Sequence, residues 1–157
     1  MGFLGHRLYI EDAPQSCSLR HSCREAVQAI VSTRMTAHEQ PVLYAVDLGE
    51  CSVIPALAPE VVAATFVEAM QSAGATVVEK LSHVFPGAGL TCILILAESH
   101  AVLHTWPETG TVNIDIFSCS TRLKSLAAIT ELGRSLGAAA VSVQEIPRAD
   151  GHGPPAV

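Results

Sequence analysis

Four short apolar runs follow one another closely in the middle of the chain, and they constrain the fold more than any other feature. They cover Thr76–Leu81, Thr91–Ala97, Ala101–Trp106 and Val112–Ser118. Runs of this length are typical of β-strands, and Gly110 stands where a turn between the last two is expected. Connections this short join antiparallel neighbours, because parallel strands need a long crossover. We therefore expect a mainly antiparallel sheet.

Helical patterns flank these strands. Glu60–Ala73 places apolar side chains on one helical face and is followed by Gly74, and Ser125–Leu136 predicts a second helix. Val42–Leu48 and Ala140–Ile146 predict two more strands. The order β-α-β-β-β-β-α-β predicts an α+β fold, a two-layer α/β sandwich with two helices on one face of the sheet.

The uncovered face of this sheet is expected to be buried as well. Thr91–Ala97 is apolar at every position but the first, as in strands that are covered on both faces. Two helices can cover only one face, so we expect two protomers to stack their sheets as a homodimer.

The length and composition predict one compact domain, since 157 residues with 49% hydrophobic content can form their own core. We expect residues 1–41 to be an N-terminal extension of unknown role, with a short helix within Cys23–Met35. Residues 42–148 would form the main domain. The Gly- and Pro-rich residues 149–157 are expected to be a disordered tail.

Several classes of protein are disfavoured by the sequence. No apolar run approaches the roughly 20 residues that span a bilayer, and the N-terminus has no signal-peptide pattern. We therefore expect a cytoplasmic protein without a membrane partner. A net charge of −6 without a basic run argues against nucleic acid. Five cysteines without a C-x-x-C pair argue against a disulfide framework or a zinc ribbon, and no metal site is expected.

Chemically capable residues gather in one short segment. Serine, histidine and carboxylate side chains, the only tryptophan and a cysteine fall within the 22 residues from Glu98 to Cys119, whereas charged residues make up only 15% of the chain. A chain this apolar can fold without such a cluster of polar side chains. We therefore expect the cluster to carry chemistry.

This segment resembles a known family. The stretch LAESHAVLHTWPETGTVNIDIFSCS is similar to the core of the short, bacterial-type S-adenosylmethionine decarboxylase proenzymes, with the pattern ESH-x-x-x-HTWPE followed by F-x-C. Upstream, VDLGEC at Val46–Cys51 and AGATVVEKLSHVFPGAGLT at Ala73–Thr91 resemble the first three strands of that family. The resemblance extends over about residues 42–147.

The resemblance implies that the chain cuts itself between Glu98 and Ser99. The Ser99 hydroxyl would attack the carbonyl of Glu98, and β-elimination from the resulting ester would split the chain. Ser99 would then become a covalent pyruvoyl group, the only cofactor implied. Decarboxylation needs an electron sink that no side chain provides, and the pyruvoyl group would supply one through a Schiff base with the substrate amine. The implied product is S-adenosylmethioninamine, for polyamine and spermidine synthesis.

The resemblance also assigns the residues that assist these reactions. His104 would be the base for the elimination, which suits an imidazole near neutral pH. Thr91 would be the processing hydroxyl, where serine is more usual. Cys119 would protonate the substrate Cα, whereas Cys51 is interpreted as structural. Cys92, Cys17 and Cys23 match no role and are interpreted as small hydrophobic residues.

The substrate site is implied less completely. Glu108 matches the carboxylate that receives the ribose hydroxyls, Phe85 matches an aromatic residue that stacks on adenine, and Glu50 could face the sulfonium. His100 and Trp106 occupy motif positions without a distinct role, and Asp115 is interpreted as structural. The implied site is shared by both protomers of the homodimer.

Two departures from the family pattern leave alternatives open. Residues 109–113 read TGTVN where the family usually has Y-G-Y-A-A, and Leu43 replaces a common histidine. A changed pocket would fit a pyruvoyl-dependent decarboxylase of arginine or ornithine. A second alternative is an unprocessed, non-catalytic partner subunit of a true decarboxylase.

Overall fold

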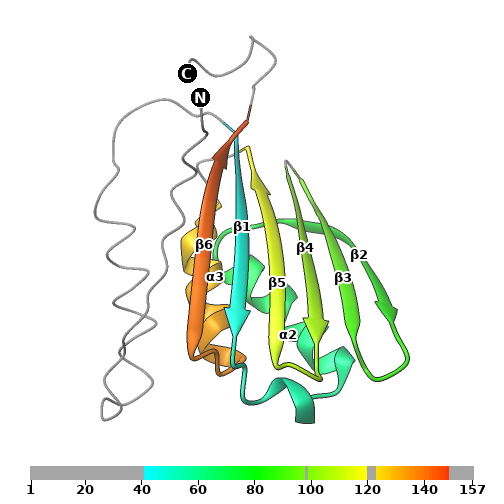
Figure 1. The fold of residues 1–157 in the computed structure, drawn as a ribbon. Helices are drawn as coiled ribbons and strands as arrows, with labels where there is room; N and C mark the ends of the chain where they lie inside the picture. The colour runs from blue at the N-terminus through cyan, green and yellow to red at the C-terminus, as the bar shows by residue number, and fades with distance from the viewer. Residues whose placement is uncertain (1–40, 98, 120–122, 149–157) are drawn as a thin grey trace.

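The computed structural model describes residues 41–97, 99–119 and 123–148. These residues form a single six-stranded sheet with two α-helices packed on one of its faces (Figure 1). The strand order is β2-β3-β4-β5-β1-β6, and every neighbouring pair is antiparallel. The predicted α+β two-layer fold is therefore confirmed. The strands are β1 (Val42–Gly49), β2 (Val77–Val84), β3 (Leu90–Leu96), β4 (Ser99–Trp106), β5 (Thr111–Ser118) and β6 (Ala140–Pro147).

The helices begin and end where the local sequence favours it. Helix α2 (Pro59–Ser72) has a proline at its first position and Glu60 in its first turn, near the positive end of the helix dipole. Gly74, just after this helix, has φ of 94°, which a residue without Cβ adopts easily. Helix α3 (Ser125–Ser135) is followed in the same way by Gly137 with φ of 65°. A 3₁₀ turn, η1 (Ile54–Ala56), lies in the connection between β1 and α2.

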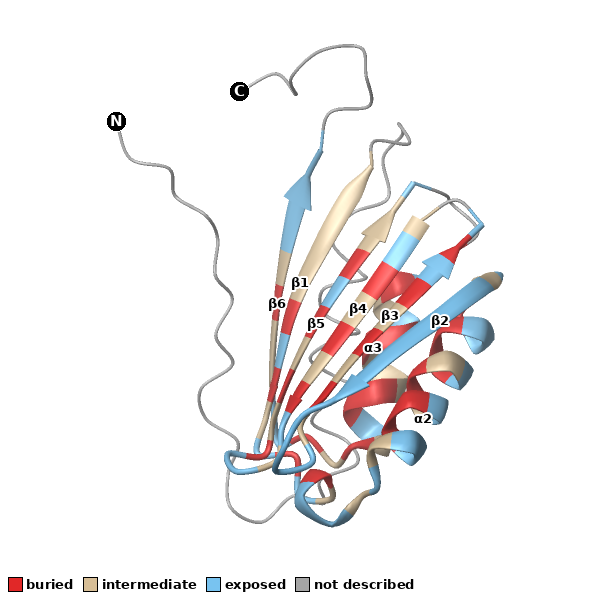
Figure 2. Ribbon diagram, turned by 90° about the vertical axis from the view of Figure 1, so that its right-hand side faces the viewer, coloured by how far each residue is buried: buried red, intermediate tan, exposed pale blue. Residues whose placement is uncertain are grey.

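The hydrophobic core lies between the sheet and the two helices. Successive side chains of a strand point to opposite faces, and the burial of these strands alternates accordingly (Figure 2). The core side chains that are almost fully buried include Val46, Leu48, Leu94, Leu103, Ile114 and Ile116 from the sheet and Phe66, Met70, Ile129 and Leu132 from the helices.

The other face of the sheet carries no helix among the described residues, and we call it the open face. The strand register assigns to it a mixture of apolar, histidine and acidic side chains. From β2 to β6 its members include Glu79, Leu81, His83, Thr91, Ile93, Ile95, His100, Val102, His104, Trp106, Thr111, Asn113, Asp115, Phe117, Leu43, Ala45, Asp47, Ser142, Gln144 and Ile146.

Some expectations differ from the structure. The apolar strand β3 is not covered on both faces within one chain, since Ile95 on the open face is 41% exposed. Strand β2 ends three residues later than the predicted Thr76–Leu81, because a polar edge strand lacks the apolar pattern that marks its end. The predicted helix within Cys23–Met35 and the tail lie outside the described residues. None of the described helices has the length and hydropathy required to cross a membrane.

Candidate active site

Ser99 and Cys119 lie together at one end of the sheet. Ser99 is the first residue of β4 and pairs with Leu96 in the tight β3–β4 hairpin. Cys119 directly follows β5, and its backbone N–H donates a hydrogen bond to Ser99 Oγ at 3.3 Å. Antiparallel pairing of β4 with β5 causes this proximity, because the start of one strand lies beside the end of the other. Glu98 lies outside the described residues.

Thr91 and His104 lie together on the open face, nearer the other end. They are direct cross-strand partners in β3 and β4, so their side chains project from the same face. Thr91 Oγ1 lies 2.7 Å from His104 Nδ1, a strong hydrogen bond between two half-buried side chains. The bond restrains the imidazole ring of His104 and engages its Nδ1. Nε2 is then the ring nitrogen that can exchange a proton with another group.

The structure does not bring His104 to Ser99 within one chain. Five residues separate them along β4, which is about 17 Å at 3.3–3.4 Å per residue. Strand alternation also points them to opposite faces, since Ser99 is in phase with the buried Ala101 and Leu103. Figure 1 shows β4 running from its Ser99 end at the top to its Trp106 end at the bottom.

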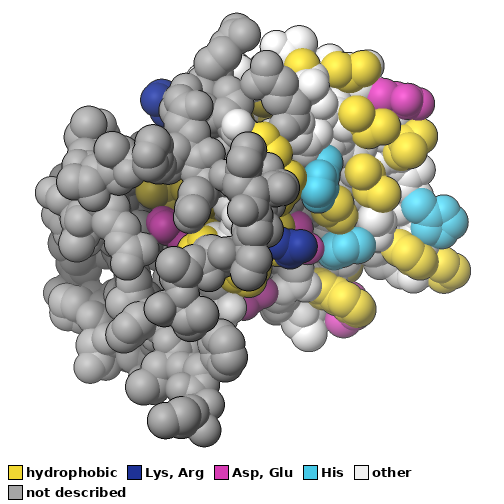
Figure 3. Space-filling view, turned by 90° about the horizontal axis from the view of Figure 1, so that it is seen from above, with side chains coloured by type: hydrophobic (Ala, Val, Ile, Leu, Met, Phe, Trp, Pro, Cys, Tyr) yellow, Lys and Arg dark blue, Asp and Glu magenta, His cyan; other side chains and the backbone are white. Residues whose placement is uncertain are grey.

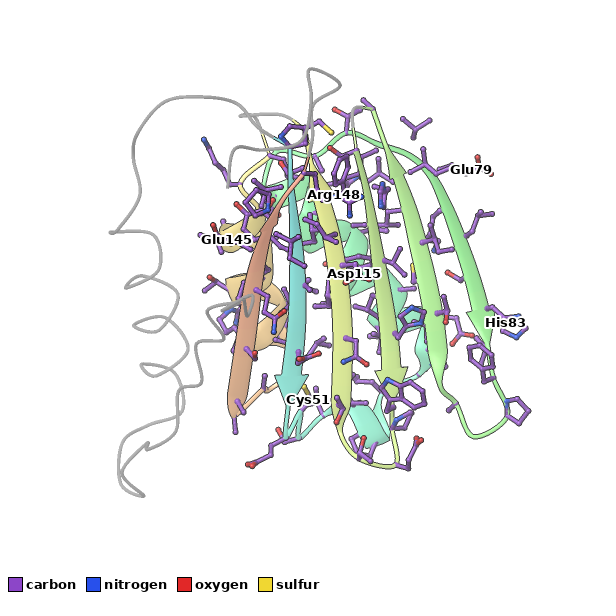
Figure 4. All side chains as sticks on the ribbon, turned by 45° about the horizontal axis from the view of Figure 1, so that its top comes forward. Cys51, Glu79, His83, Asp115, Glu145 and Arg148 are labelled. Carbon is purple, nitrogen blue, oxygen red and sulfur yellow. The ribbon has the colours of Figure 1, made fainter. Side chains whose placement is uncertain are left out.

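The predicted substrate residues lie at the lower end, with Thr91 and His104. Phe85 follows β2, is 47% exposed and receives the edge of the His83 ring at a centroid distance of 4.5 Å. Figure 4 places His83 near the lower end of β2. Glu108 is exposed in the β4–β5 turn. Glu50 directly follows β1 and lies beside this turn, because the next residue, Cys51, donates its backbone N–H to the Gly110 carbonyl at 2.8 Å.

Glu50 has an unusual backbone. Its φ is 52°, in the left-handed region that residues with a Cβ seldom adopt. Its side chain is exposed, as substrate contact requires, but it lies beyond the strand end and off the open face.

The structure gives several other motif residues distinct surroundings. Cys51 is 1% exposed, and burial raises the pKa of its thiol to about 11, so it stays protonated and packs as a small apolar residue. Cys92 is also buried. His100 stacks on Phe117 with ring centroids 5.4 Å apart. Asp115 is exposed halfway along β5, between Ala45 and Val102 of the neighbouring strands (Figure 4).

A chain of side-chain hydrogen bonds on the open face was not predicted from the sequence. Trp106 Nε1–H donates to Asn113 Oδ1 at 2.7 Å, and Asn113 Nδ2–H donates to Asp47 Oδ1 at 2.8 Å. Asn113 is the direct cross-strand partner of both Asp47 and His104, so the chain of bonds lies beside the Thr91–His104 pair. Asparagine is disfavoured in β-strands, so its presence in this apolar strand was the feature of the sequence that could have indicated a special role for Asn113.

The chemical groups thus fall into two separate half-sites. One holds a hydroxyl and a thiol at the upper rim, and the other holds an imidazole, an aromatic ring and carboxylates at the lower end. In the space-filling view from the upper end, histidine side chains lie among hydrophobic side chains on the surface that the described residues form (Figure 3). Within the described ranges no three His, Cys, Asp or Glu side chains are grouped so that they could hold a metal ion.

Comparison with known proteins gives consistent matches. Residues 42–149 match the model of a family described as S-adenosylmethionine decarboxylase. The S-adenosylmethionine decarboxylase proenzyme of Oceanobacillus iheyensis is 33% identical over 108 residues, which cover 69% of this chain and 84% of that protein. Proenzyme 2 of Halalkalibacterium halodurans is 38% identical over 89 residues, covering 57% and 68%. The crystal structure of the adenosylmethionine decarboxylase from Aquifex aeolicus has the same fold, with a TM-score of 0.63 and 22% identity over 74% of this chain and 98% of that one.

Proposed function

This chain belongs to the S-adenosylmethionine decarboxylase family, and we propose that it is a self-processing enzyme that converts S-adenosylmethionine to S-adenosylmethioninamine for polyamine synthesis. The observation that carries the proposal is the 2.7 Å hydrogen bond between Thr91 and His104. It joins two side chains that the family resemblance had assigned to one step, although they lie on different strands.

The cofactor would be a pyruvoyl group made from Ser99. Such a group supplies a ketone that can hold the substrate amine and a conjugated carbonyl that takes up electrons as carbon dioxide leaves. The position of Ser99 fits this group, because it is the first residue of β4 and forms the last pair of the β3–β4 hairpin. A cut before Ser99 therefore removes no strand pair.

His104 and Thr91 would serve maturation. When His104 Nδ1–H donates to Thr91 Oγ1, Nε2 keeps its lone pair and can accept the α-proton of residue 99 during elimination. Because the Thr91 hydroxyl can accept as well as donate, it is compatible with the tautomer that the base needs.

The functional site would lie between two protomers. The separation of about 17 Å along β4 keeps His104 away from Ser99 of its own chain. A second copy, stacked on the open face about a two-fold axis that runs across the strands, reverses the strand direction and brings its lower end over this upper end. Ser99 is the first residue of β4 and lies at this upper rim, so a partner could reach it past the strand end although its side chain is in phase with the helix face. His104, Phe85 and Glu108 of one protomer would then serve Ser99 and Cys119 of its partner.

The open face supports such stacking. It exposes Leu81, Ile95, Trp106 and Ile146, each at least 39% accessible. Isolated exposed apolar residues are common, but several on one sheet face mark a contact surface. A homodimer would cover this face as the helices cover the other.

Cys119 and Glu108 would act during turnover. In the uncut chain the Cys119 N–H donates to Ser99 Oγ, an oxygen that would leave with Glu98 on cleavage, so residue 119 begins beside the reacting group, where its thiol could return a proton to the substrate Cα. Glu108 can accept hydrogen bonds from both ribose hydroxyls of the substrate, and Phe85 can stack on its adenine.

Intact mass combined with substrate assays tests this function. Purified protein should contain pieces of 98 and 59 residues, the smaller with a blocked N-terminus, because a cut after residue 98 divides 157 residues in this way. It should release carbon dioxide from S-adenosylmethionine faster than from arginine or ornithine. Faster release from arginine or ornithine would replace the substrate, and an uncut, inactive chain would establish the non-catalytic partner instead. Neither alternative is supported by the relatives described above.

A further inference from the structure

We infer that Asn113 is a positioning residue: anchored by Asp47, it holds the Trp106 indole so that Trp106 and Phe85 receive the flat adenine ring between them. The inference rests on the proposed function and adds two residues to its substrate site. The family pattern has alanine at position 113, so the device belongs to this chain. Asn113 and Trp106 are the only asparagine and the only tryptophan in the sequence.

The hydrogen bonds allow only one orientation of the Asn113 amide. An indole N–H can only donate and a carboxylate can only accept, so the amide oxygen must face Trp106 and the amide nitrogen must face Asp47. Asp47 therefore orients Asn113, and Asn113 in turn orients the indole. Trp106 is 50% exposed, so packing within the chain alone does not fix it.

Phe85 and Trp106 flank a position that has no side chain. Gly89 lies between them at the start of β3, with Phe85 N–H donating to its carbonyl at 2.8 Å. A Cβ on Gly89 would lie 3.8 Å from Phe85 Cβ on one side and 3.4 Å from the Thr105 carbonyl oxygen on the other. An ordinary side chain here would therefore stand between the two aromatic residues.

The spacing suits one flat ring. Strands two apart in a sheet are separated by roughly 9.6 Å at their backbones. A ring stacked at about 3.5–4.0 Å from each aromatic face needs roughly 7–8 Å. The edge of His83 against Phe85 supports the outer wall, and Asn113 supports the inner wall.

The surroundings select a nucleoside cation. Glu108 follows Trp106 by two residues, in the turn where ribose hydroxyls attached to the ring would lie. The faces of Trp106 and Phe85 also attract the sulfonium charge of S-adenosylmethionine. Ornithine has no flat group to place above Gly89, and the planar guanidinium of arginine is much smaller than an adenine ring.

The single tryptophan provides a direct assay. Adenosine titrated into the purified wild-type protein should quench Trp106 fluorescence, whereas methionine, which has no flat ring, should not. Asn113→Ala should broaden the distribution of fluorescence lifetimes and weaken adenosine binding about three- to tenfold, the cost of immobilising a freed side chain. It should raise KM for S-adenosylmethionine by a similar factor and change kcat much less.

Matched variants separate positioning from general damage. Gln144→Ala removes an amide from the same face, three strands away from Trp106, and should change neither the lifetimes nor adenosine binding. Asp47→Asn keeps an acceptor for Asn113 and should preserve the Trp106 lifetimes, whereas Asp47→Ala should broaden them. If Asn113→Ala does not fold, calorimetric titration of Asp47→Ala with adenosine provides the same comparison.

Two outcomes would overturn the inference without affecting the proposed function. One is an active S-adenosylmethionine decarboxylase whose Trp106 fluorescence is insensitive to adenosine. The other is a folded Asn113→Ala protein with wild-type lifetimes and wild-type KM. A protein that binds adenosine as expected but decarboxylates none of the three amino-acid substrates would refute the proposed function and leave the adenine site standing.

Discussion

Co-expression of two inactive variants tests whether one active site needs residues from two chains. The variants are Ser99→Ala, which lacks the cleavage serine, and His104→Ala, which lacks the base. Each alone should remain uncut. The reason to expect rescue is the position of His104, five residues along β4 from Ser99 and on the opposite face of the sheet.

The symmetry of a dimer fixes the size of the rescue. Random pairing of the two variants makes about half of the dimers mixed. In each mixed dimer one site combines both defects, and the other combines an intact Ser99 with an intact His104. About a quarter of all chains should therefore be cut, since only the His104→Ala chains of mixed dimers have both groups available. A site built within one chain predicts no cleavage.

A reciprocal control uses wild type and the Ser99→Ala/His104→Ala double variant. Wild-type chains paired with the double variant lose the partner's base, so only wild-type homodimers are cut, again about a quarter of all chains. A site within one chain predicts that every wild-type chain is cut, about half of the total. Intact mass spectrometry of the purified mixture counts cut and uncut chains of each kind. Uncut variants in the first mixture together with half-cut chains in the control would refute the shared site.

Three further outcomes are expected. Cys119→Ala should still be cut, but its decarboxylation rate should fall about 100-fold or more because a general acid is lost; wild-type release of carbon dioxide would exclude this role. The contribution of Cys51 to the free energy of unfolding should be constant below about pH 8.5 and decrease by about 2 kcal/mol as pH rises to 11, because the unfolded Cys51 thiol ionises while the buried one, with its pKa raised to about 11, stays protonated. Urea denaturation of wild type and Cys51→Ala at several pH values measures this contribution as their difference, since burial also raises the pKa of Tyr44 in both proteins. Phe66→Ala, which empties a fully buried position beneath the sheet, should lower the free energy of unfolding by about 3–5 kcal/mol; a loss below about 1 kcal/mol would contradict the tight core.

Much of the fold could be predicted because the chain obeys simple periodic rules. The short connections around Gly110 and before Ser99 leave adjacent strands no choice but antiparallel pairing. Helix α2 was recognisable from its apolar face and the glycine that follows it. The position of β1 between β5 and β6 did not follow from local pattern, because it depends on pairing between segments far apart in the sequence.

The site was predicted as a list of residues but not as an arrangement. The motif identified Ser99, His104 and Cys119, yet spacing along the sequence suggested one cluster where the structure has two half-sites. Strand rise and alternation separate Ser99 from His104, whereas pairing joins Ser99 to Cys119. The Asp47–Asn113 bond spans 66 residues of sequence, and only the register of β1 against β5 reveals it.

The strand order has a consequence for what self-cleavage does to the molecule. A cut before Ser99 would assign β1, β2, β3 and α2 to one piece and β4, β5, β6 and α3 to the other. In the sheet these pieces alternate, because β1 of the first piece lies between β5 and β6 of the second. The two products would therefore be interleaved in one sheet. Neither would have a continuous sheet of its own, so folding would have to precede cleavage, and the pieces should stay together until the whole domain unfolds.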